Sequence, residues 1–174
     1  MIRLPDYAEP VRGWRVWTIG TDADAPRLRS PICPCLWQPG EALEARCQNV
    51  RRSWRRPWRT QPPEHPAPML RCSCGLHAMA APRSLTAYTL PCGGPGPVAW
   101  AIGRVALWGT VVEGTYGWRA SHAYPAELWL PNTDSMGAGL AGIGSIALGL
   151  ADYGVPVHIC DDATPYEVVG RLVR

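Results

Sequence analysis

A stretch of short β-forming runs between residues 98 and 130 constrains the fold of this chain most strongly. The runs read VAWAIGRVALWGTVVEG, YGWRASHAYP and AELWL. They are interrupted by Gly103, Gly109, Gly114, Gly117 and Pro125. Because glycine within a strand pattern marks bends and bulges, we predict a tightly curved antiparallel sheet or small β-barrel as the core.

Shorter patterns on both sides of this stretch predict further elements. Residues 12–19 and 43–47 are rich in β-forming side chains with apolar–polar alternation, so we expect two more strands there. Residues 138–152 contain enough Ala and Leu for a helix, and residues 155–160 are typical of a strand. The chain therefore combines early strands with late helices.

The end of the sequence carries a helix-start signal. TPYE at residues 164–167 is a capping box with Pro at the first helical position, and it opens a last helix through Val173. We predict an α+β chain that forms a single domain over residues 1–174. Its parts are a curved barrel core over residues 12–131 and a helix–strand–helix cap over residues 132–174.

Positive charge is concentrated in one short segment. All seventeen basic residues are arginines, and the formal net charge is only +3, which by itself does not indicate a nucleic-acid partner. Five of these arginines lie in RRSWRRPWR, residues 51–59, with two Trp and no acid. Residues 49–65 are polar and interrupted by Pro, so we expect a long surface loop without regular structure.

The basic segment has the two residue types that nucleic acid requires, since arginine binds phosphates and tryptophan stacks on bases or wedges between them. The residues predicted to bind nucleic acid are Arg51, Arg52, Trp54, Arg55, Arg56, Trp58 and Arg59. The alternative is a solvated basic loop in a chain whose composition favours Arg over Lys throughout.

No targeting or membrane segment is expected. The first ten residues, MIRLPDYAEP, lack the charged and apolar regions of a secretory signal. The most apolar stretch, residues 137–151, is Gly-rich and shorter than the roughly 20 residues of a membrane span. Seven Cys without an export signal favour thiols and metal ligands over disulfides. We therefore expect a cytoplasmic protein with no membrane partner.

The sequence RCSCG at residues 71–75 suggests a metal site. Cys72 and Cys74 are separated by one residue, a spacing at which a disulfide is implausible and a shared metal ion is natural. A structural zinc ion takes four Cys or His ligands in a tetrahedron. The further candidates are Cys33, Cys35, Cys47, His65, His77 and Cys92.

Two of these candidates are favoured by their surroundings. His65 lies between Pro63 and Pro66 in PPEHPAP shortly before Cys72, and Cys47 ends a predicted strand just before the basic segment. We predict a structural Zn²⁺ bound by Cys47, His65, Cys72 and Cys74, which would clamp the loop at residues 48–65 and limit its closure entropy. His77 as fourth ligand, a separate site at Cys33 and Cys35, and unliganded buried thiols with a surface His remain as alternatives.

RCSCGLHAM and GRVALWGTVVEGTYGWRASHAYPAELWL resemble a pattern of small, mostly uncharacterised actinobacterial zinc-binding proteins. The shared motifs are Cys-x-Cys-Gly, Gly-x-Val-x-Leu-Trp-Gly, and Gly-Trp-Arg-Ala followed by Ala-Tyr-Pro. With GWRVW, LRS, W-x-PG and A-x-C upstream, the likeness spans residues 12–131. A Cys and a His recur before the Cys-x-Cys pair in that pattern, which implies Cys47 and His65 as ligands, whereas a Tyr is more usual at the position of His77.

This resemblance also implies a PUA-like barrel related to the SRA domains that read methylcytosine, which is an analogy at the level of the fold. A reader of modified bases needs a pocket with aromatic walls and polar groups for the base edge. The residues predicted to form it are Trp37, Trp108, Trp118, Arg119 and Tyr124. Trp37 would be presented by the Pro-rich loop at residues 31–40, Trp118 and Arg119 would face outward beside a Gly-rich turn, and for Trp108 a place in the barrel core is the stronger alternative.

Two other activities are disfavoured. GAGLAG at residues 137–142 matches Gly-x-Gly-x-x-Gly, but five residues separate it from the preceding strand, and the upstream chain does not alternate strands and helices as a dinucleotide-binding domain does. Glu113, His122 and Asp134 are titratable residues near the core, yet no nucleophile or paired-carboxylate motif surrounds them. We do not expect an enzyme.

Together these patterns predict a nucleic-acid-binding protein that reads 5-methylcytosine in duplex DNA and contains a structural zinc ion. The alternative is a zinc-stabilised module in which the Trp-rich loop contacts a protein partner. Salt distinguishes the two, because binding to phosphates weakens steeply as salt rises.

Overall fold

Two long antiparallel strands span the molecule. The computed structural model describes residues 9–32, 35–47, 51–53, 56–61, 65–87, 99–131, 142–161 and 165–173. In it, β7 (Ala99–Gly114) and β8 (Gly117–Pro131) form a hairpin, so the three runs expected after residue 98 become two strands. The second and third runs join through Pro125, which lies opposite a register shift just before Val105. Such a bulge accommodates a residue that has no backbone N–H.

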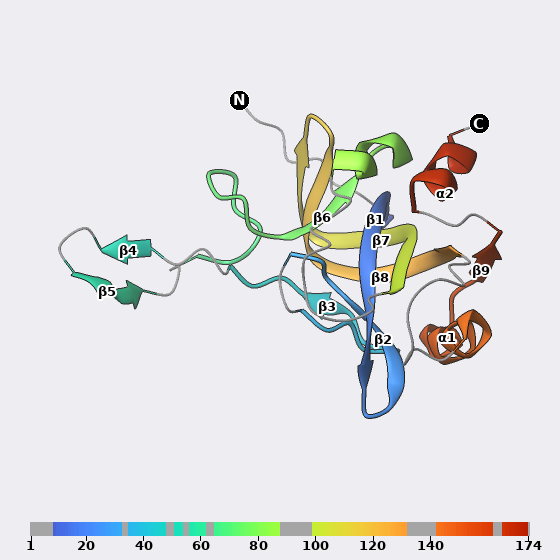
Figure 1. Ribbon diagram of the computed structural model, residues 1–174. Helices are drawn as coiled ribbons and strands as arrows, with labels where there is room; N and C mark the ends of the chain where they lie inside the picture. Colours follow the sequence, from blue (N-terminus) through green and yellow to red (C-terminus); the bar gives the residue numbers. More distant parts are fainter. Residues whose placement is uncertain are drawn as a thin grey trace.

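Four strands pair in a ring. β1 (Val11–Asp22) pairs with β7, β7 with β8, and β8 with β6 (Leu76–Met79), which returns to β1 through the pair Trp14 and Met79. The other members of the seven-stranded sheet are β2 (Ala25–Arg29) beside β1, and β3 (Leu43–Glu44) and β9 (Val157–Cys160) beside β8. Most of the described chain is sheet with a few helices, so the predicted α+β class is confirmed (Figure 1).

Glycine marks the second irregularity of the long hairpin. The β7–β8 register shifts between Trp108 and Val111, and Gly109 in this interval has a φ of +76°. A Cβ at Gly109 would lie 2.3 Å from the Oγ of Ser121. Any side chain would therefore meet both an unfavourable backbone conformation and a steric clash. The expectation that glycine allows this sheet to bend is confirmed here.

The end of the chain has the predicted order of helix, strand and helix. α1 (Ile143–Leu150) continues into the 3₁₀ turn η2 (Ala151–Tyr153), and α2 (Pro165–Leu172) follows β9. β9 pairs in parallel with β8, so this strand belongs to the main sheet rather than to a separate cap. α1 contacts β2 and β9, whereas α2 contacts β7 and η1 (Pro82–Ala87). The GAGLAG motif lies outside the described residues except for Gly142.

The basic segment forms a second, two-stranded sheet. β4 (Arg51–Ser53) pairs antiparallel with β5 (Arg56–Gln61), and Figure 1 shows this hairpin standing away from the main sheet. The expectation of a loop without regular structure is therefore wrong. That expectation was based on the interruption of the segment by proline, including Pro57. Both strands of a two-stranded sheet are edge strands, however, and an edge strand tolerates Pro. Trp54 and Arg55 lie outside the described residues.

Trp37 is part of the core. Its side chain is 1% exposed and its ring contacts that of Trp17 edge-on, with 5.7 Å between the ring centroids. The Nε1 of Trp37 donates a hydrogen bond to the Oγ of Ser30 over 3.1 Å. The expectation that residues 31–40 present Trp37 to solvent is wrong, because Ser30 satisfies the indole N–H and so lowers the cost of burying the ring.

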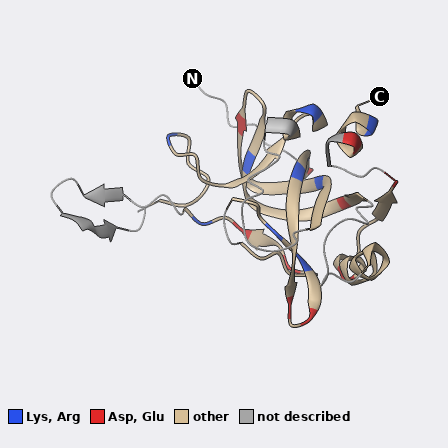
Figure 2. Ribbon diagram, viewed as in Figure 1, with Lys and Arg blue, Asp and Glu red and all other residues tan. Residues whose placement is uncertain are grey.

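A second buried cluster lies between the sheet and the last helix. Trp100 and Ile102 of β7 pack there with Val168 and Val169 of α2 and with Leu85 of η1. Figure 2 shows the described charges scattered over the molecule rather than gathered on one face. Among the helices that the structure describes, none has the length and apolar character needed to cross a membrane.

Candidate metal centre

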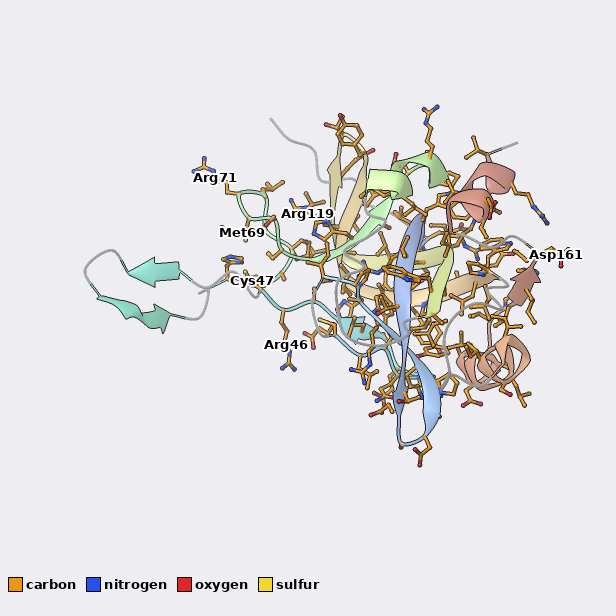
Figure 3. The ribbon with its side chains drawn as sticks, viewed as in Figure 1. Arg46, Cys47, Met69, Arg71, Arg119 and Asp161 are labelled. Atoms are coloured by element: carbon orange, nitrogen blue, oxygen red, sulfur yellow. The ribbon has the colours of Figure 1, made fainter. Side chains whose placement is uncertain are left out.

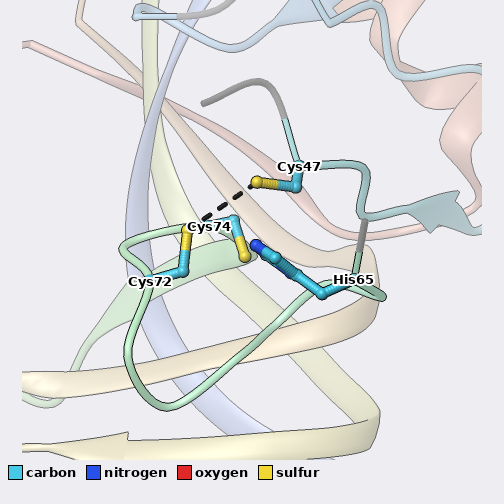
Figure 4. Close-up of side chains that lie close together, drawn as sticks. All are labelled: Cys47, His65, Cys72 and Cys74. Carbon is cyan, nitrogen blue, oxygen red and sulfur yellow. Dashed lines mark hydrogen bonds between the residues drawn. The ribbon is translucent and has the colours of Figure 1, made fainter. Parts of the chain in front are cut away.

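Three segments that are separate in the sequence contribute four candidate ligands. Cys47 follows β3, His65 follows the β4–β5 hairpin, and Cys72 and Cys74 lie in the loop before β6. One donor atom from each of the four lies within 4.8 Å of all the others. Figure 4 shows the three sulfur atoms and the imidazole turned toward one another. The structure thus brings together the four residues that the sequence predicted.

The donor atoms fit a zinc ion. The Sγ atoms of Cys47 and Cys72 are 3.7 Å apart. Two sulfur ligands of a tetrahedral site with Zn–S distances of about 2.3 Å lie about 3.8 Å from each other. Three Cys and one His are a usual ligand set of structural zinc. The cysteines that the structure describes are all free thiols, so none of the three is held in a disulfide.

The ring of His65 makes a hydrogen bond of the kind that orients metal-binding histidines. Its Nδ1 lies 2.9 Å from the carbonyl oxygen of Pro66. A carbonyl oxygen can only accept, so Nδ1 carries the proton of this bond and Nε2 carries the lone pair. A backbone carbonyl bonded to one ring nitrogen of a metal-binding His is a common arrangement, because it fixes both tautomer and ring orientation.

Cys74 is the most enclosed of the four ligands. Its side chain is buried, and burial raises the pKa of the thiol to about 11 from an ordinary value of 9.0. A backbone hydrogen bond from Met69 opposes this shift, and the neighbouring Cys72 and Cys47 add to it. A bound cation reverses the balance, since metal coordination favours the thiolate. Three thiols close together are thus better suited to a metal ion than to protons.

Gly75 allows the Cys-x-Cys loop to turn into β6. Its φ is +121°, a conformation that residues with a side chain rarely adopt. A Cβ at this position would lie 2.9 Å from the Cβ of Pro68 and 3.1 Å from that of Arg119. The glycine of the motif is therefore required both by the backbone and by close packing.

Arg119 of β8 holds the same loop from the sheet. Its Nη1 donates to the carbonyl oxygens of Cys72 and Cys74 and lies 3.4 Å from that of Met69. Figure 3 shows this side chain directed toward the loop that carries Met69 and Arg71. Arg119 was predicted to face outward as part of a base pocket, but the structure places it against residues 69–75, the metal loop, which contains Cys72 and Cys74. Sequence spacing contains no signal for this contact, because the two segments meet only through the β6–β8 pairing.

The alternative ligands lie elsewhere or outside the described residues. The Nε2 of His77 is 2.8 Å from the carbonyl oxygen of Ser73, and burial lowers the pKa of this imidazole. His77 and Cys35 are not members of the four-residue cluster. Cys33 and Cys92 lie outside the described residues.

The centre closes the base of the basic hairpin. Cys47 precedes β4 and His65 follows β5, so a metal ion bound to both joins the two ends of the segment that contains the predicted nucleic-acid-binding residues. The backbone pairing of β4 and β5 places Arg51 opposite Gln61 and Arg52 opposite Thr60. Arg56, Trp58 and Arg59 lie in β5.

The residues predicted to form a base pocket lie in different environments. Trp118 is half-buried against the main core, and its Nε1 is buried without a hydrogen-bond partner among the described residues. Trp108 is half-buried and its ring stacks on that of His122 at a centroid distance of 6.1 Å. The hydroxyl of Tyr124 donates to the carbonyl oxygen of Tyr153 and accepts from the N–H of Gly40.

A cavity of about 580 Å³ lies beside the metal centre, between β1, the segment after β2, residues 43–46 and residues 73–79. None of the five predicted pocket residues lines it. Arg15 and Ser30 are among the lining residues. They lie in the GWRVW and LRS motifs, but nothing in the sequence pattern assigned a site to either residue.

Comparisons with protein-family models, curated proteins and solved structures found no match.

Proposed function

We propose that this protein is a zinc-stabilised nucleic-acid-binding module whose β4–β5 hairpin contacts DNA. The observation that carries the proposal is the position of Cys47 and His65 at the two ends of the hairpin, with their donor atoms in one four-residue cluster. The segment between them contains the five clustered arginines and two tryptophans of residues 51–59 and no acid in that stretch.

The bound zinc ion supplies a fixed connection and no chemistry on a substrate. An isolated two-stranded hairpin is marginally stable in water. A zinc ion that joins its two ends restricts the conformations of the free hairpin. The hairpin then loses less conformational entropy when it binds DNA. The zinc ligands Cys72 and Cys74 lie just before β6, which pairs with β8 of the main sheet. Arg119 of β8 also holds the backbone of Cys74, so the zinc ion would link the hairpin to the main sheet.

The proposal is tested by titrating the zinc-loaded protein against a short fluorescent duplex over a salt series. If two to five arginines contact phosphates, the slope of log Kobs against log salt concentration is expected to be about −2 to −4.5. Replacing Arg55 and Arg56 with Gln should weaken binding at low salt at least tenfold.

The matched control replaces Arg83 and Arg171 with Gln, which removes two positive charges from η1 and α2 instead. If the control lost as much DNA affinity, the loss in the hairpin variant would be explained by the overall charge of the protein rather than by the hairpin. Absence of binding at low salt would contradict the proposal.

We propose further that the protein recognises 5-methylcytosine in DNA and that its ring of strands is related to PUA-like barrels. Both proposals rest on the sequence resemblance over residues 12–131. Matched unmethylated, hemimethylated and fully methylated duplexes test the first proposal. Tighter binding to a methylated duplex supports a reader, whereas equal affinities leave a hairpin that contacts phosphates alone.

The second candidate function is protein binding at the metal loop. Met69 and Leu70 are 43% and 50% exposed at its tip, next to the exposed Arg71 (Figure 3). Exposed apolar side chains beside an arginine are typical of interface residues. Such a contact would respond weakly to salt, and Leu70→Ser would weaken it without changing the binding of DNA.

A further inference from the structure

The cavity beside the metal centre has the size of a ligand site. It measures about 580 Å³, and ligand pockets in proteins commonly measure about 300–1,000 Å³. Its wall includes Cys74 and Gly75, so one side of the cavity is formed by the metal loop itself. A small organic molecule fits this volume.

Most of the wall is apolar. Val16, Leu43, Leu76 and Leu85 contribute aliphatic side chains, and Trp14 contributes an aromatic one. Contact with such walls removes apolar surface from water, which favours a ligand with an apolar body.

A cation is held in place within this wall. Arg15 is half-buried, and its two terminal nitrogens donate to the carbonyl oxygen of His77 and, over 2.9 Å, to the Oγ of Ser30. Its guanidinium lies 5.2 Å from the centroid of the Trp37 ring. The positive charge is thus already positioned, so a ligand that meets it does not have to order a flexible side chain.

The rest of the lining leaves the positive charge in excess. Arg46 adds a second guanidinium and Glu44 adds one carboxylate, and both of these residues are exposed. Among the described residues, no other residue of the lining has an acidic side chain. Charge complementarity therefore favours an anionic ligand over a cationic one.

We propose that this cavity binds a small organic anion with a flat apolar body, such as an aromatic carboxylate or sulfonate. The apolar walls bind the ring system, and Arg15 and Arg46 attract the anionic group. This inference does not depend on nucleic-acid binding, because none of the described lining residues belongs to the β4–β5 hairpin.

The test compares two probes that share the same ring system. 1-Anilinonaphthalene-8-sulfonate carries a negative charge, whereas N-phenyl-1-naphthylamine is uncharged. The zinc-loaded full chain should bind one molecule of the sulfonate, at least tenfold more tightly than the amine. Near-ultraviolet circular dichroism recorded during the titration ensures that the folded protein is the species that binds.

Variants locate the binding site. Ala45→Trp at the half-buried edge of the cavity should weaken sulfonate binding at least tenfold by filling space, and Arg46→Gln should weaken it several-fold. Arg15→Lys should retain more affinity than Arg15→Met because it keeps the charge. Arg12→Gln is the matched control, an exposed arginine of β1 outside the lining, and should leave binding unchanged.

If Arg15→Met does not fold, Ala45→Trp and Arg46→Gln decide the question. The proposal is overturned if the folded protein does not bind the sulfonate or if the two probes bind equally well. Full sulfonate affinity in a folded Ala45→Trp variant would also place the site elsewhere and overturn it.

Discussion

Arg119 donates a hydrogen bond from Nη1 to the carbonyl oxygen of Cys74 over 2.8 Å. The same nitrogen bonds the carbonyl oxygen of Cys72, so the backbone on both sides of Ser73 is held by one side chain of β8. The sheet therefore helps to position the loop that carries two of the four ligands.

Loss of the Arg119 contact is expected to weaken metal binding. Hydrogen-bond partners outside the ligand set change metal affinity by about 10–100-fold when removed. Arg119→Met should fall in this range, and Arg119→Lys should lose less because an ammonium group can still donate. Competition with a chromophoric chelator measures the affinity, and Arg12→Met is the control. Wild-type affinity in a folded Arg119→Met variant would show that the loop orders itself without this side chain.

Removal of a ligand should destabilise the zinc-loaded protein. Zinc ion at a free concentration of a hundred times its Kd stabilises the native state by about 2.7 kcal/mol. For a chain of this size, that free energy raises the Tm by about 5–10 °C. Cys72→Ser and Cys74→Ser should lose this stabilisation, whereas Cys35→Ser, outside the cluster, should retain it. Thermal melts with and without a chelator make the comparison. A Cys72→Ser variant that still gains stability from zinc would exclude Cys72 as a ligand.

Gly75 offers a test of the motif's glycine. Gly75→Ala combines the unfavourable φ of +121° with contacts of 2.9 and 3.1 Å to Pro68 and Arg119. Gly40→Ala has only the unfavourable φ of +75°, since no atom lies within 4 Å of its added Cβ. The control should lose about 1–2 kcal/mol of unfolding free energy and Gly75→Ala more. Only Gly75→Ala should also lower zinc affinity. Denaturant titrations measure the unfolding free energies, and equal losses in the two variants would contradict a steric role for Gly75.

Tyr153 predicts a pH dependence of stability. Burial raises the pKa of its hydroxyl above 10, although a hydrogen bond from the Leu28 N–H opposes the shift. The unfolded chain then loses this proton at lower pH than the native state, so the contribution of Tyr153 is complete below pH 10 and declines as pH rises through the native pKa.

The hydroxyl of Tyr153 also donates to the carbonyl oxygen of Trp37 over 2.6 Å. Tyr153→Phe should therefore be less stable at neutral pH by about 1–3 kcal/mol. The gap to the wild type should narrow above pH 10. Urea titrations between pH 7 and 11 measure this gap, and a constant difference would argue against the raised pKa.

The metal ligands could be predicted from sequence because each stands out locally. Cys72 and Cys74 are too close for a usual disulfide, and His65 lies between prolines. Their assembly with Cys47 follows from the chain returning to the same place after the hairpin. Arg119 could not be predicted in its observed role, since its partners are backbone carbonyls and no residue type encodes them.

Trp37 shows where local reading gives the wrong result. Its neighbours, PICPC and QPG, are typical of an exposed turn-rich segment. Its burial depends on Trp17 of β1, on the Ser30 hydroxyl and on the guanidinium of Arg15. Three contacts from other parts of the chain outweigh the local pattern, and no single window of sequence contains them all.

The ring of strands has a consequence for the order in which the molecule assembles. β1 pairs with β7 from Val11 opposite Leu107 to Ile19 opposite Ala99, so this strand emerges from the ribosome long before its partner. The β1–β2 and β7–β8 hairpins can form locally, but closing the ring requires contacts between distant residues, and such contacts slow folding. Until β7 arrives, one edge of β1 remains open to pairing with other chains. We therefore expect a nascent chain halted before residue 99 to be prone to aggregation.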